Sequence, residues 1–489
     1  MDCEKESSIG KIKTSLCEVL ILTETIKKIS NFAVLWLNIG ITCNRRMKYF
    51  IQIFGCQMNI SDAQRIAGLF ESRGMKEAST AEAADVFVAV MCSVRQMAAD
   101  RVFGLEQKIK SVKKKNKKFI AILSGCITES DKPRFAEIFD HILDIKTLPR
   151  WPKILHLARG KSREGLTFAN SRRSNLRDYF AIPPKQTSKF SALVPISKGC
   201  DNYCSYCVVP HTRGPLAGRP AEDILAEIES AVKNGAKEIW LLGQNVNNYH
   251  FQDIDFAKLL RAANEIPGDF WLRFTSPHPK DFDDNAVLAM AQCQKVTPYL
   301  NLPVQSGDNH ILKAMKRPYT AARYKALVKK IRAAFKKHRQ GLEREIAIST
   351  DVIVGFCGET EKQFQNTARI FKEIKYDMAY ISRYSKRPGT AAALLDDNVS
   401  DREKKRREEI LNDIVKITAL AHNKKWCGKT VDVLVDRVKN GFGFGKDRHY
   451  KTVKFRIEKN DIKPGDIVNA KIIKAQSFGL MGALVKNEK

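Results

Sequence analysis

The sequence predicts an α/β protein with three folded parts: an N-terminal parallel α/β domain, a central partial (β/α) barrel and a small C-terminal β-barrel. Apolar, strand-like segments alternate with helical segments from residue 47 to about residue 425, and this alternation is typical of parallel sheets. From residue 429 the pattern changes to short alternating segments separated by glycines and Lys/Asp turns, as in small β-barrels. A chain of 489 residues is also too long for a single core, so several domains are expected.

Residues 1–46 do not show the pattern of a folded domain. Their charges are mixed, their cysteines lack ligand-like spacing, and no signal-peptide layout is present. Because the first convincing strand begins at Met47, we expect 1–46 to be an N-terminal extension, either a poorly ordered arm or sequence upstream of a true translation start at Met47. The other predicted parts are the N-terminal domain at 47–165, an Arg-, Ser- and Pro-rich linker at 166–189, the central domain at 190–425 and the C-terminal domain at 426–489.

Each of three buried strand-like segments in the N-terminal domain precedes a cysteine. The segments 49–54, 85–90 and 119–123 are followed by Cys56, Cys92 and Cys126, here called the N-terminal triad. The carboxyl ends of parallel strands lie at one edge of the sheet, where sites form. One cysteine there is usually a small buried hydrophobe, but three in the same topological place predict a cluster site. A helix from Ser61 to Gly74 is expected after the first cysteine.

The central domain carries a second set of cysteines within one short loop. Cys200, Cys204 and Cys207, here called the central triad, follow the spacing C-x3-C-x2-C, and Tyr206 directly precedes the last of them. Three thiolates can hold three irons of a [4Fe–4S] cluster, whereas closed clusters and structural zinc sites take four ligands. We therefore expect a fourth iron that is open to a ligand other than protein. The alternatives are a chance grouping or a zinc knuckle completed by His211.

Six strand-like segments predict an open, TIM-like (β/α) barrel, in which functional residues lie at the carboxyl ends of the strands. The segments are 191–196, 238–242, 271–274, 299–302, 347–354 and 378–382. Polar residues at the ends of these strands are candidates for cofactor or substrate contacts: Gln244, Asn245, Gln305, Ser306 and Asp351. Each alone fits a turn with capping residues, but their repetition after successive strands predicts a lined cavity.

Lysine and arginine outnumber aspartate and glutamate by 84 to 54, which gives a net charge of +30. This excess indicates a polyanionic partner, most simply nucleic acid. A membrane surface is the alternative, but the best apolar run, 32–41, is too short to span a bilayer. The twelve cysteines are too scattered for a secreted disulfide scaffold, so we expect a reducing, cytoplasmic location.

The C-terminal domain follows a charged helix at 401–425. Its segment 441–451 combines glycine, aromatic and basic residues and is expected to be a loop. Unpaired bases stack on aromatic side chains while basic groups contact phosphates, so Lys446, Arg448, Tyr450 and Lys451 are predicted to bind RNA. The alternative is a solvated basic surface on a structural barrel.

The two triads and the order of the domains resemble the methylthiotransferases, which are radical S-adenosylmethionine (SAM) enzymes. That family has an N-terminal three-cysteine domain, a radical-SAM core and a C-terminal RNA-binding barrel called TRAM, and the resemblance covers residues 48–484. Six motifs are similar to the tRNA 2-methylthio-N6-isopentenyladenosine synthases within it: FGCQMN at 54–59, CSVR at 92–95, KGCDN at 198–202, LLGQNVN at 241–247, FTSPHP at 274–279 and LPVQSG at 302–307. Two positions depart from the family pattern, with Val90-Met91 in place of Asn-Thr and Cys357 in place of proline. Neither removes a cluster ligand, so tuning rather than loss of activity is expected.

The resemblance implies that the six triad cysteines are catalytic, that they hold two [4Fe–4S] clusters, and that SAM binds at the central triad. The N-terminal cluster would hold the sulfur to be inserted. The implied product is a methylthio group at C2 of N6-dimethylallyladenosine just 3′ of the tRNA anticodon. Tyr206 and the polar candidates above would contact SAM or the base. The implied partners are the anticodon loop of tRNA, an electron donor such as flavodoxin or ferredoxin, and a sulfur donor or cluster carrier; a monomer without a membrane partner is expected.

Three other functions stay open. A methylthiotransferase could act instead on N6-threonylcarbamoyladenosine in tRNA or on a ribosomal protein, and a non-catalytic iron–sulfur protein could bind RNA. The first two alternatives differ from the main interpretation in substrate alone. The third has no need of an iron that is open to a further ligand, so the central triad argues against it.

Overall fold

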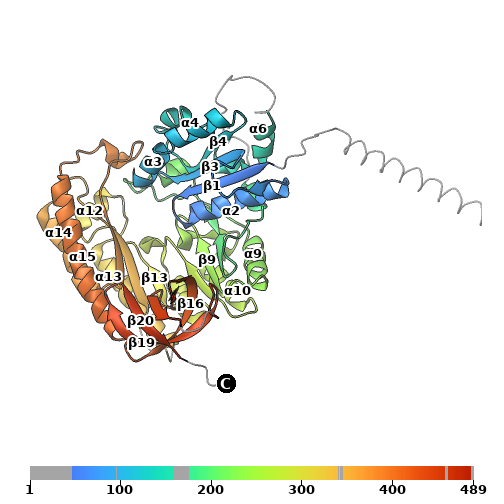
Figure 1. Ribbon diagram of the computed structural model, residues 1–489. Coiled ribbons are helices and arrows are strands. Elements are labelled where there is room, and N and C mark those ends of the chain that lie inside the picture. Colours follow the sequence, from blue (N-terminus) through green and yellow to red (C-terminus); the bar gives the residue numbers. More distant parts are fainter. Residues whose placement is uncertain are drawn as a thin grey trace, which may run out of the picture. The chain divides into compact units, whose positions relative to one another are not determined.

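The computed structural model describes residues 47–485, apart from 95, 158–175, 340, 342–344 and 458–460 (Figure 1). The predicted extension at 1–46 and the first part of the predicted linker lie outside the described residues. The described chain forms a five-stranded sheet, two three-stranded sheets of a partial barrel, and a closed five-stranded barrel, which confirms the predicted fold class. None of the helices described has both the length and the apolar character needed to cross a bilayer.

The N-terminal sheet has the strand order β2-β1-β3-β4-β5, and all its pairs are parallel. Its strands are β1 (Lys48–Phe54), β2 (Lys76–Glu77), β3 (Val86–Cys92), β4 (Ile120–Cys126) and β5 (His141–Ile142). Strand β3 is buried over its whole length, which accounts for its continuous apolar sequence. The sequence predicts that β3 and β4 end before their cysteines, but both strands continue to Cys92 and Cys126, which pair in register.

Helix α2 (Gln57–Ser72) begins before the predicted start at Ser61. Cys56 occupies its N-cap, and the Cys56 N–H donates to Asn59 Oδ1 at 3.3 Å, so the first cysteine of the triad stands at a helix N-terminus. The other helices of this part are α3 (Gln96–Phe103), α4 (Glu106–Lys115), α5 (Lys132–Ala136), the 3-10 helix η1 (Ile145–Arg150), α6 (Trp151–Leu157) and α7 (Leu176–Phe180).

Helix α7 lies within the segment predicted to be a linker. Tyr179 and Phe180 are buried, and the Tyr179 hydroxyl donates to Asp62 Oδ1 at 2.6 Å. This part of the segment therefore packs against the N-terminal domain through its aromatic side chains. The Arg- and Ser-rich composition of the whole segment did not indicate this packing.

The central partial barrel consists of two parallel sheets with the orders β12-β9-β6 and β13-β14-β15. A bridge between Leu272 and Val296 links the first sheet to the segment that leads into β13. The strands are β6 (Ser191–Pro195), β9 (Glu238–Leu242), β12 (Trp271–Phe274), β13 (Tyr299–Asn301), β14 (Ala347–Val354) and β15 (Met378–Arg383). All six agree with the predicted segments to within a residue or two at each end.

The helices of this part bury one face of each barrel strand in a large apolar core. They are α8 (Val209–Arg213), α9 (Ala221–Lys233), α10 (Phe256–Glu265), α11 (Asp284–Gln292), α12 (Asn309–Ala314), α13 (Ala321–His338), α14 (Glu361–Ile374) and α15 (Asp401–Lys424). Figure 1 shows α15, in orange, running beside α14 toward the C-terminal strands. The predicted charged helix thus packs on the barrel and leads into the next domain.

The C-terminal strands close into a barrel of order β16-β17-β18-β20-β19. They are β16 (Thr430–Lys439), β17 (Phe442–Lys446), β18 (Thr452–Arg456), β19 (Ile467–Gln476) and β20 (Gly479–Leu484). The prediction of a loop across 441–451 is wrong for its first half, which is strand β17. A Cβ at Gly443 would overlap the Phe455 ring, and one at Gly445 would overlap the Leu434 carbonyl, so these inward positions require glycine.

The remaining loop after β17 fastens the C-terminal barrel to the central one. Arg273 of β12 donates through Nη2 to the Asp447 carbonyl at 2.8 Å and through Nη1 to the Arg448 carbonyl at 3.0 Å. Lys451 Nζ forms a buried ion pair with Asp377 Oδ1 at 2.6 Å. These contacts join segments far apart in the sequence and hold the loop against the amino ends of the barrel strands.

Candidate active site

The structure brings the N-terminal triad together at the carboxyl edge of its sheet. Cys56 is exposed at the N-cap of α2, whereas Cys92 and Cys126 are buried at the ends of adjacent strands. The Cys92 thiol lies close enough to the other two to affect the pKa of both. The expectation that three strand ends gather these cysteines therefore agrees with their positions.

Electrostatics within the N-terminal triad favour thiolates at two of its three cysteines. Interaction with the Cys92 thiol lowers the pKa of Cys56 to about 6 and that of Cys126 to about 7 against the opposing effect of burial, and the charge of Arg213 acts in the same direction. The same thiol contacts raise the pKa of Cys92. Thiolates are the metal-binding form of cysteine, so this donor set fits an iron–sulfur cluster.

Arg213 joins the two triads. It ends helix α8, which directly follows Cys207, and its Nε donates to Cys126 Sγ at 2.9 Å. Its Nη2 also pairs with Asp62 Oδ2 at 2.6 Å, and both side chains are almost fully buried. The loop of the central triad is thereby held beside the N-terminal triad.

The central triad occupies a loop with a fixed backbone. Gln244 Oε1 accepts the Gly199 N–H at 2.6 Å, and Gly199 has a φ of +81° in a place where a Cβ would overlap Gly214 and Pro215. Burial raises the pKa of Cys200, and it raises that of Cys207 to about 12.

Arg317 supplies a cation to this buried loop, because its Nη1 lies 3.6 Å from Cys204 Sγ. Among the described residues, no group of three or more His, Cys, Asp or Glu side chains is arranged to hold a single metal ion. A four-iron cluster differs from a single ion because each thiolate binds its own iron, and the central triad offers three thiols for that purpose.

The other predicted cofactor contacts have varied surroundings. Tyr206 packs into an apolar cluster beside the central triad. Ser306 is buried, and its hydroxyl lies 3.4 Å from that of Thr367. Gln305 and Asp351 meet through a backbone hydrogen bond of 2.9 Å.

Two of these candidates stand among the polar groups next to the central triad. Asn245 donates to Asp281 Oδ2 at 2.7 Å, while its Oδ1 is buried without a hydrogen-bond partner in the described chain. Gln244 is already engaged by Gly199. Their roles as SAM or base contacts stay predictions.

Sequence reasoning missed three cations around the triads. Arg213 and Arg317 contact cysteine sulfurs, and the Lys198 amine is buried without a hydrogen-bond partner in the described chain. Burial lowers the pKa of Lys198 to about 7. Arg213, soon after Cys207, and Lys198, two residues before Cys200, lie near a triad in the sequence. Arg317 gave no local signal, because it lies 113 residues from Cys204.

The four predicted RNA-binding residues all make contacts inside the protein. Lys451 pairs with Asp377, and Lys446 Nζ donates to Thr452 Oγ1 at 2.6 Å. Arg448 lies over the Trp271 ring at 5.5 Å. Tyr450 packs its ring 4.7 Å from Tyr299 and 5.3 Å from Trp240. Their assignment to RNA stays a prediction, and the positions of Arg448, Tyr450 and Lys451 show contacts that join the two barrels.

A surface that the sequence analysis did not identify lies on the outer side of β16–β18. The inward glycines of β17 leave Phe442 and Phe444 facing outward, and basic residues flank them on both neighbouring strands. Register pairs give two rows, Arg437–Phe444–Lys454 and Lys439–Phe442–Arg456, here called the cation–aromatic face. Arg437 lies 4.5 Å from the Phe444 ring and Lys454 lies 4.0 Å from the Phe442 ring.

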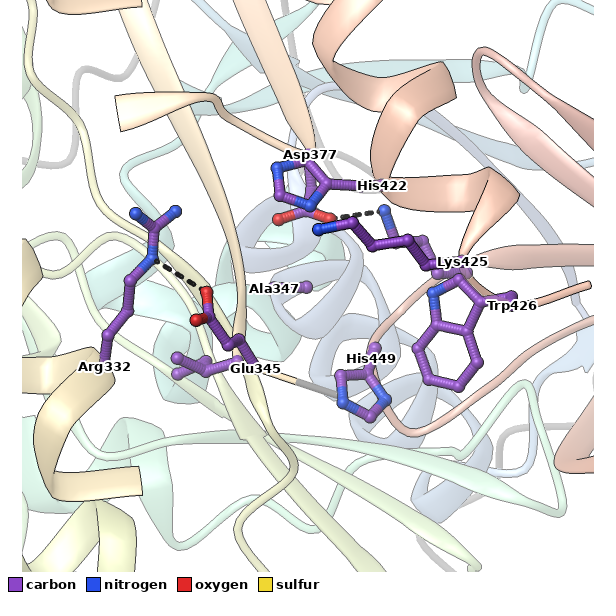
Figure 2. A pocket seen from close by; sticks show the side chains of 10 residues that line it. Arg332, Glu345, Ala347, Asp377, His422, Lys425, Trp426 and His449 are labelled. Carbon is purple, nitrogen blue, oxygen red and sulfur yellow. Dashed lines mark hydrogen bonds and ion pairs between the residues drawn. The ribbon is translucent and has the colours of Figure 1, made fainter. Parts of the chain in front are cut away.

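A polar cavity of about 220 Å³ lies away from the triads. Its lining includes Glu345, the first residue of β14 and the end of α15, with Trp426 and His449 on the side opposite Arg332 (Figure 2). It therefore opens at the amino ends of the barrel strands, whereas the central triad follows a carboxyl end. This position makes it part of the junction between the barrels.

Known families match three stretches of the chain. The uncharacterized protein family UPF0004 matches residues 48–145, the radical SAM superfamily matches residues 194–371 and the TRAM domain matches residues 424–485. A solved structure of the radical S-adenosylmethionine methyltransferase TsrM from Kitasatospora setae is similar in fold, with a TM-score of 0.50 and 14% identity over 72% of this chain and 75% of that chain.

Relatives with assigned activities match nearly the whole length. The tRNA-2-methylthio-N(6)-dimethylallyladenosine synthase of Thermobifida fusca is 37% identical over 447 residues, or 88% of either chain. The synthase of the same name from Neisseria gonorrhoeae is 35% identical over 455 residues, which cover 90% of this chain and 99% of that one. The protein thus belongs to the family of the tRNA-2-methylthio-N(6)-dimethylallyladenosine synthases, as the resemblance of its motifs predicts.

Proposed function

We propose that the protein is a radical SAM methylthiotransferase that modifies C2 of N6-dimethylallyladenosine beside the anticodon of tRNA. The observation that carries the proposal is the juxtaposition of the two triads, because Arg213, on the helix that follows the central triad, reaches Cys126 of the N-terminal triad. A reaction that activates a carbon at one cluster and delivers sulfur from another needs two such sites side by side. Relatives of the same name, similar over most of the chain, support the choice of substrate.

The chain's own residues would hold the two clusters and SAM in place. The bound cofactors supply the radical and sulfur chemistry, and the protein positions them and excludes water. Gln244 keeps the backbone of the central loop in place, and Arg317 offsets the charge of Cys204. Arg213 does the same for Cys126 and keeps the two loops adjacent.

The cation–aromatic face supports tRNA as the partner. Its phenylalanines offer stacking surfaces and its four basic residues offer phosphate contacts, a combination typical of single-stranded nucleic acid binding. The net charge of +30 favours the same partner. We place RNA contacts on this face as well as on the exposed part of Arg448.

The remaining partners follow from the proposed chemistry. Reduction of a cluster requires an electron donor such as flavodoxin or ferredoxin, and repeated sulfur insertion requires a sulfur donor or a cluster carrier. A cytoplasmic monomer is consistent with scattered cysteines and a tRNA substrate.

The test is to reconstitute the full chain anaerobically and supply SAM, a reductant, sulfide and tRNA that carries N6-dimethylallyladenosine. About eight irons per chain, the sum of two four-iron clusters, and formation of the 2-methylthio nucleoside are expected. About four irons would contradict the two-cluster site. Methylthiolation of N6-threonylcarbamoyladenosine or of a ribosomal protein instead would establish a sister activity, and absence of 5′-deoxyadenosine would contradict the enzyme assignment.

A further inference from the structure

The interior of the central barrel is lined by a different set of residues from its helix-covered side. Alternate residues of a strand face opposite ways, and Ile239 and Leu241 of β9 pack into the core under the helices. Trp240 and Leu242 therefore face the interior, where they form a separate apolar cluster. Its other members are Met58, Leu193, Tyr299 and Tyr450.

This interior cluster begins beside both triads. Met58 stands two residues after Cys56, and Leu242 stands two residues before Gln244, the residue that holds Gly199 next to Cys200. Tyr450 enters the cluster from the opposite direction, on the loop of the C-terminal barrel. The cluster thus extends from the neighbourhood of the cysteines to the junction between the barrels.

Tyr380 adds an aromatic ring on the same side. In β15, Ala379 and Ile381 pack against the helix-covered core, so Tyr380 between them faces the interior. Its register partner is Asp351, and it lies near enough to Tyr299 and Tyr450 to contribute to the raised pKa of both, after burial as the main cause. Tyr380 is 42% exposed although it faces inward, which leaves its ring accessible to a bound group.

We propose that Trp240, Tyr299, Tyr380 and Tyr450 form an aromatic wall that binds the dimethylallyl group on N6 of the substrate adenine. The inference deepens the proposed function and rests on it. C2 and N6 lie on different sides of N1 in the purine, so a base whose C2 faces the triads directs its N6 substituent away from them. The interior cluster leads away from the triads toward the junction between the barrels, and its apolar rings match a branched five-carbon group.

The wall also excludes the polar alternative substrate. A threonylcarbamoyl group carries a carboxylate that would need a free cation in an apolar site. The two cations against the Tyr450 ring, Arg273 and Lys446, are already engaged. Arg273 bonds to Glu238, Thr297 and two loop carbonyls, and Lys446 bonds to Thr452.

The test compares affinities of the reconstituted full-length protein for three anticodon stem–loop RNAs, in the presence of SAM without reductant at one fixed salt concentration. The RNAs carry adenosine, N6-dimethylallyladenosine or N6-threonylcarbamoyladenosine at the target position. Each methylene removed from water is worth about fourfold in affinity, so the wild type should favour the dimethylallyl RNA over the adenosine RNA at least about tenfold. Tyr380→Ala and Tyr450→Ala should each reduce this preference at least about threefold, while Tyr450→Phe should retain it.

Two variants serve as controls. Phe478→Ala removes an exposed aromatic side chain from the same C-terminal barrel and should leave the preference unchanged. Arg456→Ala removes an exposed charge from the cation–aromatic face, so it should weaken binding of all three RNAs alike. An equal loss of preference in Tyr450→Ala and Arg456→Ala would overturn the part assigned to Tyr450.

Two results separate the wall from the proposed function. In the first, the wild type methylthiolates the dimethylallyl RNA, but Tyr380→Ala and Tyr450→Ala keep its full preference for that RNA over the adenosine RNA. This result would overturn the aromatic wall and leave the proposed function standing. A wild type that methylthiolates neither tRNA substrate would overturn the proposed function.

Discussion

Arg213 shows how one side chain can couple two sites. Its guanidinium is buried and contacts both a carboxylate and a cysteine sulfur. A buried cation is costly unless it is paired and hydrogen-bonded, and Asp62 provides that pair while Tyr179 donates to the other oxygen of Asp62. This chain of contacts links helix α7, helix α2 and the loop of the central triad.

Breaking the buried pair should destabilise the protein strongly. Arg213→Ala should lower the free energy of unfolding by roughly 3–5 kcal/mol, because Asp62 would keep a buried charge without its partner. Urea unfolding of the variant checks this value. Lys110→Ala is the control, because its ion pair with Glu106 is exposed and should contribute little to stability. Equal effects of the two substitutions would contradict the role assigned to Arg213.

The cysteines of the two triads should be separable by substitution. Cys56→Ala should leave cleavage of SAM intact and abolish sulfur insertion, because it removes a ligand from the N-terminal site alone. Cys204→Ala should abolish both reactions. Measurement of 5′-deoxyadenosine and of the 2-methylthio nucleoside in the same samples checks both variants, and an equal loss in the two would argue against the division of labour.

At the scale of elements, strand β17 explains an unusual sequence. The alternation Phe442-Gly443-Phe444-Gly445 follows the period of a strand, with glycine inward and phenylalanine outward. Inward glycine makes room for Phe455 of the neighbouring strand. The same alternation exposes two rings to the basic residues of β16 and β18.

The loop after β17 should make stability depend on pH. Burial raises the pKa of Asp447 to about 6, whereas an unfolded aspartate titrates near 3.9. Between these values the folded protein binds more protons than the unfolded chain, so stability should fall as pH rises from about 4 to 6, by an amount on the order of 3 kcal/mol.

Asp447→Asn should remove this component of the pH dependence, because the amide does not ionise. Thermal unfolding at several pH values, with Asp413→Asn on the exposed side of α15 as the control, measures the difference between variant and wild type. A wild-type slope that persists in Asp447→Asn would show that the buried carboxyl group is not its source.

At the scale of the whole molecule, the C-terminal barrel has two separate tasks. Its loop at 447–451 fastens to the central barrel through Arg273 and Asp377, while β16–β18 carry the cation–aromatic face. The basic and aromatic residues of 441–451 therefore fall into two groups. One group docks on the central barrel, and the other lies on the outer surface of the C-terminal barrel. The division follows the end of β17, because the strand carries the outward phenylalanines and the loop after it docks on the central barrel.

The outer face should contribute to the salt dependence of tRNA binding. The double variant Arg437→Ala/Lys454→Ala should weaken binding and reduce the slope of log affinity against log salt by about 0.7 for each phosphate that the variant no longer neutralises. Phe442→Ala should cost roughly 1–3 kcal/mol if one base stacks on it, without changing the slope. Filter binding at several salt concentrations checks both, with Lys336→Ala/Lys337→Ala on α13 as the control for charge. An unchanged slope in the first variant would place the phosphates elsewhere.

Local pattern was enough to predict most of the strands and both cysteine triads. Runs of apolar residues mark buried strands, and the close spacing of Cys200, Cys204 and Cys207 places them in one loop before any folding is known. Parallel topology then brought Cys56, Cys92 and Cys126 to one edge. The six motifs indicated the family, and relatives that are 35–37% identical to this chain confirm it.

Contacts between distant segments could not be predicted in this way. Arg213 and Cys126 are 87 residues apart, and Arg317 and Cys204 are 113 apart, so neither pair leaves a local pattern. The docking of Tyr450 and Lys451 could not be predicted either. A basic, aromatic loop has the same composition whether it faces RNA or another domain. Local sequence encodes which segments bury a face, whereas the packing of whole domains determines which buried side chains meet.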